Sequence, residues 1–147
     1  MSFARIAVCC LLCAALAACA AQRRAADENA GGLALENLAG RVYYLVSVDG
    51  KSFAGGNAPE LGFTREGRVV GSACNRFSGD ARIADSTLTA KIAATTRMAC
   101  TRPVLNELEQ IVFGMLRNGA RISLDGNRLT LTGEGHALVY ALPSPKP

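Results

Sequence analysis

The sequence predicts a mainly β domain in which one amphipathic helix covers a curved antiparallel sheet. Most apolar segments are short, and turns that contain Gly, Asp or Asn separate them. Only one stretch, near residues 102–118, repeats its apolar residues at helical spacing. The length of 147 residues rules out two large domains, and the 50% apolar content suffices for one core and rules out intrinsic disorder.

The strand predictions depend on turn signals between segments rich in Val, Ile, Leu, Tyr and Thr. Asp49-Gly50 ends the first segment, and Arg65-Glu66-Gly67 is a hairpin connection in which Gly67 can adopt positive φ. In the last third, two more Gly-containing turns separate alternating segments, which predicts a meander with one face on the core. The predicted strands are 41–48, 61–64, 68–73, 82–83, 87–90, 92–98, 121–124, 128–132 and 137–142.

The helix is predicted from its ends and from its apolar stripe. Thr101 is a suitable cap, Pro103 fits the first turn, and Asn118-Gly119 is a stop signal. The apolar residues between these ends recur every three or four positions, so we expect them to face the core. They are Val104, Leu105, Leu108, Ile111, Val112, Met115 and Leu116.

The N-terminal segment differs from the rest of the chain and is predicted to be a signal peptide, residues 1–18. Arg5 precedes an uncharged apolar run that is shorter than the roughly 20 residues of a transmembrane helix. The run ends in Leu16-Ala17-Ala18-Cys19, which resembles a bacterial lipobox. Cys19 is therefore the predicted lipidation site; the alternative is an ordinary secretory peptide cut near Ala18.

Acylation of Cys19 would hold the protein on a membrane, because two or three acyl chains bind a bilayer almost permanently. Ala20 follows the cysteine, and in lipoprotein sorting a residue other than Asp at this position implies the outer membrane. Residues 19–37 are rich in Ala and contain Gly31-Gly32, which predicts a lipidated tether. The folded domain is then predicted at 38–142, with a short tail at 143–147.

Composition excludes several classes of function. The net charge of +4 comes from interspersed charges, and only 5% of residues are aromatic, so we predict no nucleic-acid partner. His136 is the only histidine, which excludes metal sites that need two imidazoles. The sequence contains no Gly-rich phosphate-binding pattern, and we predict neither a cofactor nor a metal.

Two motifs carry a resemblance to a known family. They are Cys74-Asn75-Arg76-Phe77-Ser78-Gly79 and Thr96-Arg97-Met98-Ala99-Cys100, which precede the predicted helix. At this separation the pair resembles the META domain family, and the resemblance covers residues 38–142. It implies a partly barrel-like module on bacterial lipoproteins, linked to heat response, novobiocin tolerance and envelope phenotypes, with no established catalytic activity.

Cys74 and Cys100 are predicted to form a disulfide. Export places the domain in an oxidising compartment, and once the leader is removed and Cys19 is acylated these are the only two thiols left. Two buried free thiols are the alternative. A zinc site formed by Cys74, Cys100 and His136 is a weaker alternative, because no CxxC or HxxxH spacing among these residues supports it.

Residues 75–78 allow a structural and a functional interpretation. Asn75 and Ser78 with the following Gly79 favour a tight connection, which Phe77 would anchor in the core. In the functional interpretation, Asn75, Arg76, Phe77 and Ser78 are candidate binding residues. Arg76 would then donate to an acidic partner or to a lipopolysaccharide phosphate.

We therefore predict a non-enzymatic envelope lipoprotein, a monomer held on the outer membrane with its domain in the periplasm. It would bind an envelope protein or lipid, in envelope stress response or novobiocin-type antibiotic tolerance. The scattered carboxylates Asp80, Asp85, Glu107 and Glu109 are more typical of solvated positions than of acid–base pairs. The alternatives are a carrier or chaperone for an apolar ligand, and inhibition of an envelope peptidase by the 52–59 loop.

Overall fold

The computed structural model of the protein describes residues 32–54 and 57–144. Cys19 and the predicted leader lie outside the described residues. The helices in this part are α2 (Leu35–Leu38) and α3 (Pro103–Asn118). The strands are β1 (Arg41–Val48), β2 (Lys51–Ser52), β3 (Glu60–Phe63), β4 (Arg68–Ser72), β5 (Arg76–Ala84), β6 (Thr87–Thr95), β7 (Ala120–Asp125), β8 (Arg128–Gly133) and β9 (His136–Ala141).

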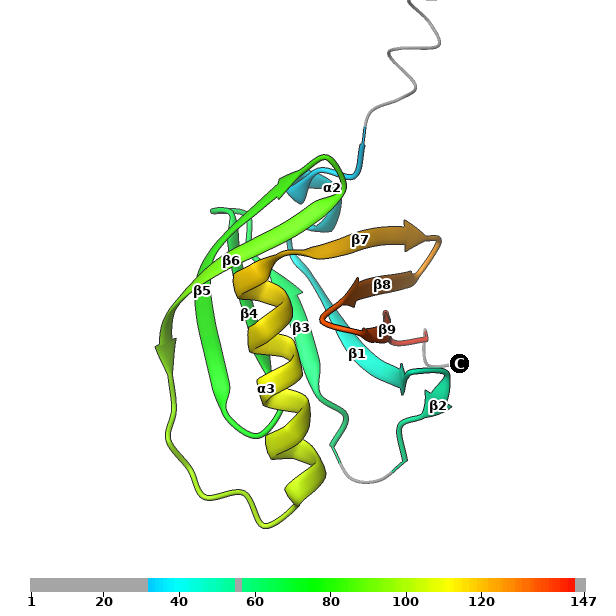
Figure 1. Ribbon diagram of the computed structural model, residues 1–147. Coiled ribbons are helices and arrows are strands. Elements are labelled where there is room, and N and C mark those ends of the chain that lie inside the picture. Colours follow the sequence, from blue (N-terminus) through cyan, green and yellow to red (C-terminus); the bar gives the residue numbers. More distant parts are fainter. Residues whose placement is uncertain (1–31, 55–56, 145–147) are drawn as a thin grey trace, which may run out of the picture. The chain divides into compact units, whose positions relative to one another are not determined.

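The strands form one antiparallel sheet that closes into a barrel (Figure 1). Neighbours follow the order β2-β1-β3-β4-β5-β6-β7-β8-β9, and β1 also pairs with β9. The ring therefore contains every strand except β2, which extends β1 through a turn at Asp49-Gly50. Both turn residues have positive φ, of 51° and 75°, as a tight two-residue hairpin requires. The predicted mainly β class, a curved antiparallel sheet or partial barrel with one long helix, is confirmed.

Residues 76–95 depart from the prediction, because they form one long hairpin of β5 and β6. Arg76 and the residues after it belong to a strand, whereas the composition suggested a tight connection there. Gly79 sits where the register with β6 shifts, and a Cβ at this position would collide with the carbonyl of Lys91. The glycine thus allows a close approach of two backbones at a bulge instead of making a turn.

Helix α3 confirms the predicted amphipathic helix and contributes one face of the core. Leu108, Val112, Met115 and Leu116 are all buried, and the helix packs against β6 and β8. Its N-cap is Arg102 in extended conformation, without a side-chain cap, so the expectation that Thr101 caps the helix is wrong. In the described residues, no helix combines the length and hydropathy needed to cross a membrane.

The seam between β6 and β7 is the shortest joint of the ring. These strands pair only through Thr87 with Arg121 and Leu88 with Ala120. Helix α3 connects the two strands in the chain and lies against β6 (Figure 1). The helix therefore covers the side of the barrel where strand pairing is weakest.

The folded part begins before residue 38, the expected start of the domain. Leu35–Leu38 form α2, in which Leu38 is fully buried. Leu33 and Leu35 also pack against the core. Residues 33–37, which were assigned to the tether because of their composition, therefore belong to the fold. Three leucines within six residues were the available signal.

One buried polar group in the core has no partner. Tyr43 is fully buried, and its hydroxyl is the single buried side-chain nitrogen or oxygen of the described residues that lacks a hydrogen bond. An unpaired buried hydroxyl costs free energy that phenylalanine avoids at almost the same volume. We expect Tyr43→Phe to raise the free energy of unfolding by about 1 kcal/mol in urea titrations. Tyr44→Phe, at an exposed position of the same strand, is the control and should change it little.

Candidate functional site

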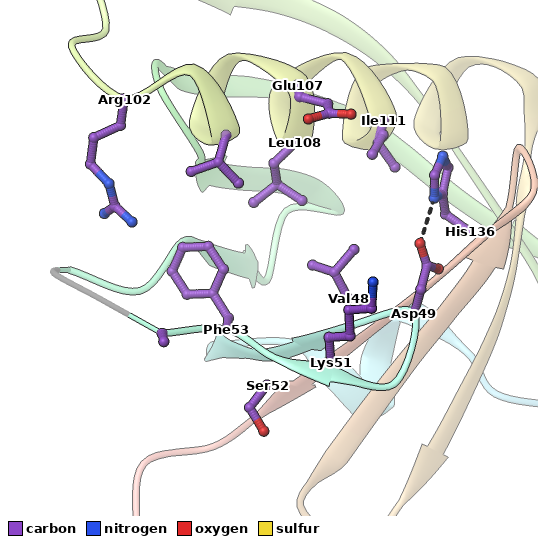
Figure 2. A pocket seen from close by; sticks show the side chains of 12 residues that line it. Val48, Asp49, Lys51, Ser52, Phe53, Arg102, Glu107, Leu108, Ile111 and His136 are labelled. Atoms are coloured by element: carbon purple, nitrogen blue, oxygen red, sulfur yellow. Dashed lines mark hydrogen bonds and ion pairs between the residues drawn. The ribbon is translucent and has the colours of Figure 1, made fainter.

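A groove lies between the β1–β2 hairpin and the N-terminal half of α3 (Figure 2). Its volume is about 530 Å³, within the range of ligand pockets. Apolar side chains from both elements form its floor, and polar side chains form its rim. The floor contains Val48, Phe53, Leu108 and Ile111, exposed Val104 lies at the mouth, and the rim contains Asp49, Lys51, Arg102, Glu107 and His136.

An Asp–His pair fixes one end of the groove. His136 Nδ1 lies 2.8 Å from Asp49 Oδ2, and the backbone N–H of Ala137 donates to Asp49 Oδ1 at 2.8 Å. The carboxylate can only accept, so the imidazole carries its proton on Nδ1. Asp49 thus ties the β1–β2 turn to the start of β9. The hydrogen bond from His136, followed by that from Ala137, holds the pKa of Asp49 below its usual 3.8.

The lowered pKa of Asp49 makes its contribution to stability pH-dependent. A carboxylate with a depressed folded-state pKa stabilises the protein above about pH 4, and the effect is lost as the pH falls through the folded-state value. We expect Asp49→Asn to lower the melting temperature at pH 7, with a difference from wild type that shrinks below pH 4. Asparagine tolerates the positive φ of this position, so the backbone is unaffected. Thermal unfolding of both proteins between pH 3 and pH 7 tests this.

The opposite end of the groove is closed by an aromatic side chain. The guanidinium carbon of Arg102 lies 5.8 Å from the centroid of the Phe53 ring, a cation–π distance. Phe53 follows β2, and its N–H donates to the carbonyl of Val46 at 2.8 Å. The ring points toward α3 (Figure 2). Phe53 was not singled out in the sequence, where an aromatic residue next to a Gly-rich loop was the available signal.

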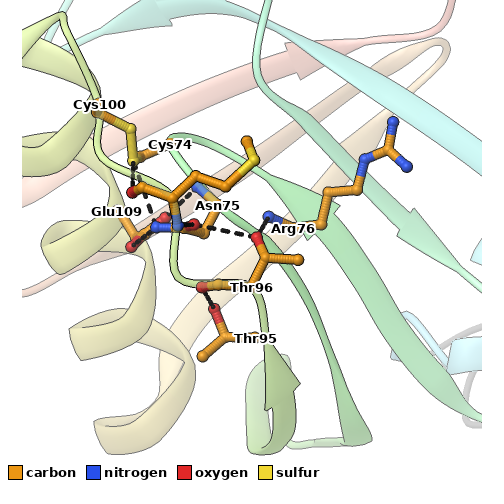
Figure 3. Close-up of a disulfide and its surroundings, with 8 residues drawn as sticks. Cys74, Asn75, Arg76, Thr95, Thr96, Cys100 and Glu109 are labelled. Atoms are coloured by element: carbon orange, nitrogen blue, oxygen red, sulfur yellow. Dashed lines mark hydrogen bonds between the residues drawn. A yellow bond between two sulfur atoms is a disulfide. The ribbon is translucent and has the colours of Figure 1, made fainter.

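Cys74 and Cys100 are joined in a disulfide, and their Cα atoms are 5.8 Å apart (Figure 3). Both sulfurs are used in this bond, and His136 bonds with Asp49 at the groove. Cys74, Cys100 and His136 therefore do not form the alternative zinc site. Within the described residues, no group of three or more His, Cys, Asp or Glu is arranged for a metal ion.

Asn75 organises the surroundings of the disulfide from a buried position. Its backbone N–H donates to Glu109 Oε2 at 2.5 Å, and its Nδ2 donates to Glu109 Oε1 at 3.2 Å. Its Oδ1 accepts from the Met98 N–H at 2.7 Å and from Thr96 Oγ1 at 3.0 Å. Asn75 therefore connects helix α3 with the segment that follows β6 (Figure 3).

The four candidate binding residues are not brought to one surface. Asn75 and Phe77 are buried, and the Phe77 ring meets Phe113 of α3 edge to face, with centroids 5.2 Å apart. The hydroxyl of Ser78 accepts from Arg68 at 3.3 Å. Arg76 alone is exposed, because neighbours along a strand point to opposite faces. It lies between two shallow depressions on the outer face of the sheet.

The scattered carboxylates also have separate surroundings. Asp80 pairs with Arg68 at 3.4 Å on the surface, and Asp85 lies in the β5–β6 turn with a φ of 49°. Glu109 is buried with Asn75, whereas Glu107 lines the groove. These four residues therefore form no acid–base pair.

Most of the chain is similar to known proteins. The META domain model matches residues 36–144. The chain is also 42% identical over 108 residues to "Heat shock protein HslJ" of Escherichia coli (strain K12), and the match covers 73% of this chain and 77% of that relative.

Solved structures resemble the described fold as well. One NMR structure is 40% identical, has a TM-score of 0.68 and is matched over 75% of this chain and 95% of its own. An NMR structure from Burkholderia xenovorans is 20% identical, with a TM-score of 0.57 and coverage of 76% and 87%. A crystal structure of a DUF4847 family protein from Bacteroides vulgatus ATCC 8482 is 18% identical, with a TM-score of 0.53 and coverage of 76% and 98%. The latter two support the fold alone.

Proposed function

Because the chain belongs to the META domain family, we propose that it is a lipid-anchored protein of the bacterial envelope whose barrel binds another envelope component. The groove between β2 and α3 carries this proposal. A lipobox-like sequence ending at Cys19 supports the anchor, and the residue that follows it supports the outer membrane as its place. The domain would then lie in the periplasm.

The groove fits a short protein segment with one or two apolar side chains. Val104 at its mouth is 48% exposed, and Phe53 and Ile111 are partly buried, so their apolar surface remains available to a partner. The rim carries both signs of charge, with Lys51 and Glu107 on opposite walls. Polar rims around an apolar centre are typical of protein interfaces. We therefore assign the groove to a segment of an envelope protein.

The same residues support binding rather than catalysis. An Asp–His pair needs a nucleophile or a polarised water beside the free imidazole nitrogen to catalyse hydrolysis. Ser52, the hydroxyl residue that lines the groove, points away from His136 (Figure 2). Asp49 is also engaged by the Ala137 N–H. The Asp49–His136 pair is thus explained by a structural role, in which it holds the β1–β2 turn against the start of β9.

Membership of the family supports a role in envelope stress. The Escherichia coli relative is named a heat shock protein, and the family resemblance implies links to heat response and novobiocin tolerance. We extend this role to the present chain. Loss of the protein is then expected to sensitise cells to heat or novobiocin. We expect the wild-type gene to restore tolerance and a gene that encodes an altered groove not to restore it.

The two alternative functions receive less support. Apolar side chains such as Phe63, Leu131 and Tyr140 fill the barrel interior, which disfavours a carrier that encloses an acyl chain. Of the 52–59 loop, residues 55–56 lie outside the described residues. Phe53 of this loop points into the groove, whereas a peptidase inhibitor would present such a side chain outward.

Site-specific crosslinking in intact cells tests the proposal. A photoreactive amino acid replaces Lys51 at the rim of the groove, and a second strain carries it at Arg82, which is exposed on β5. We expect a discrete adduct, identified by mass spectrometry, from position 51 only. Val104→Asp places a charge at the mouth of the groove and should abolish the adduct and the rescue of novobiocin tolerance. Equal capture from both positions would contradict the proposal, and mass spectrometry of the mature N-terminus tests acylation separately.

A further inference from the structure

Residues 96–100, the first part of the loop between β6 and α3, have a backbone held by hydrogen bonds, and the side chains of residues 96–99 are exposed. Thr96 N–H donates to the Arg76 carbonyl at 2.9 Å, and the Arg76 N–H donates to Thr96 Oγ1 at 3.1 Å. The N–H of Met98 donates a hydrogen bond to Asn75 Oδ1, and Cys100 forms the disulfide with Cys74. Both ends and the middle of the loop are therefore held to the barrel.

The side chains on this loop are unusual for a surface exposed to water. Residues 93–99 are all exposed, and Arg97 is the only charged residue among them. Met98 is 64% exposed, more than any other large hydrophobic side chain of the described residues. A rigid backbone that presents an apolar side chain loses little conformational entropy when that side chain is buried by a partner. Insertion of Met98 into an apolar environment would therefore cost little conformational entropy.

Next to the loop in the sequence, all charged residues are positive, and Glu109, the carboxylate linked to the loop through Asn75, is buried. From residue 86 to residue 106 the sequence contains no Asp or Glu, whereas Lys91, Arg97 and Arg102 are present. Arg76 adds a further exposed guanidinium beside Thr96. Apolar residues flanked by arginine fit the boundary between anionic headgroups and acyl chains, where each basic residue contributes about 1 kcal/mol. An acidic protein segment would satisfy the charges but would leave the exposed apolar residues Ala93, Ala94, Met98 and Ala99 without a role.

We propose that the 96–100 loop docks on the anionic bilayer that holds the Cys19 lipid, with Met98 at the acyl boundary and Arg97 and Arg76 on phosphate groups. This inference rests on the proposed lipid anchor. It adds a second membrane contact, which sets the orientation of the barrel.

The length of the chain permits this arrangement. The loop lies at the end of the barrel opposite α2, near which the described chain begins (Figure 1). Helix α3, with 16 residues, runs between these ends and is about 24 Å long at 1.5 Å per residue. From Cys19 to Gly32 the chain can span at most about 45 Å. When the loop rests on the bilayer, the segment before Gly32 is therefore long enough for Cys19 to reach the same bilayer.

Fluorescence on the acylated full chain tests the docking. An environment-sensitive fluorescent amino acid replaces exposed Ala99, and a control protein carries it at exposed Asn127 in the β7–β8 turn. Each protein is reconstituted in vesicles of phosphatidylethanolamine and phosphatidylglycerol that contain brominated acyl chains, or in phosphatidylcholine vesicles with the same quencher. We expect quenching at position 99 in the anionic vesicles only, reduced by salt, and none at position 127.

Two substitutions separate the charged and apolar contributions. Arg97→Gln is expected to lower the equilibrium between docked and undocked loop about fivefold, the factor that corresponds to one basic residue at the surface. Met98→Asp should abolish the quenching, whereas Arg82→Gln, a matched loss of charge near the far end of β5, should leave it unchanged. No quenching at position 99, or quenching that ignores Arg97→Gln and Met98→Asp, would overturn the docking. If the proposed lipid anchor is wrong, the mature N-terminus will be unacylated. If the proposed binding role of the groove is wrong, position 51 will give no crosslinked adduct.

Discussion

Loss of the Cys74–Cys100 disulfide is expected to lower the free energy of unfolding by about 3.5 kcal/mol. The bond closes a loop with a sequence separation of 26 residues, and the chain-entropy model gives about this value for a loop of that size. Small domains are stable by only about 5–15 kcal/mol, so the loss is a large fraction of the total. Urea unfolding of the wild type and of the Cys74→Ala/Cys100→Ala protein measures it.

Reductant is the control for this measurement. Dithiothreitol should destabilise the wild type to the level of the double variant, and it should leave the double variant unchanged. A difference between oxidised and reduced protein below about 1 kcal/mol would show that the reduced chain keeps the same constraint by other means.

Asn75→Ala is expected to lower the free energy of unfolding by about 3 kcal/mol. The substitution removes the hydrogen bonds of the Asn75 side chain with Glu109, Thr96 and Met98. Buried Glu109 then keeps the backbone N–H of residue 75 but loses the side-chain donor, and a buried carboxyl group that loses a hydrogen-bond partner costs free energy. Urea titration monitored by circular dichroism provides the value.

Asn106→Ala is the matched control for Asn75→Ala, because Asn106 is exposed on α3. Alanine favours the helix slightly, so the control should be neutral or stabilising by a few tenths of a kcal/mol. Equal effects of the two substitutions would contradict a structural role for Asn75. Glu109→Gln offers an independent test: it replaces one acceptor by a donor that faces a donor of Asn75, and we expect a cost of about 1–3 kcal/mol.

Local signals predicted most of the fold. Asp49-Gly50 and the Gly-containing turns between the last strands mark real hairpins, because their positive φ values are encoded by the turn residues themselves. The apolar stripe located α3 almost to the residue. The resemblance carried by the two cysteine-containing motifs is confirmed by the match to the META domain.

Composition was misleading where long-range contacts decide the structure. Asn75, Ser78 and Gly79 are turn residues by composition, yet the last two lie in β5 because the strand pairs with β6. Position 79 must be glycine because the backbone of Lys91 on β6 leaves no room for a Cβ atom. Lys91 is distant in the sequence, so no local pattern predicts this contact. Similarly, α2 is held by the burial of Leu38 more than by helix propensity.

The groove could not have been predicted from the sequence alone. Asp49 and His136 are 87 residues apart in the chain and meet only because β1 pairs with β9. Phe53 and Arg102 meet because α3 packs beside the β1–β2 hairpin. Their chemistry is ordinary for surface loops, so only closure of the barrel identifies them as the walls of one site.

The short pairing of β6 with β7 has a dynamic consequence. Only two residue pairs join these strands, so the backbone amides there have few neighbours to protect them from solvent. We expect deuterium to enter this joint earlier than the β8–β9 ladder, where six residue pairs are formed. Local opening of the barrel would thus begin between β6 and β7. By packing against β6, helix α3 stabilises this joint and keeps the barrel closed.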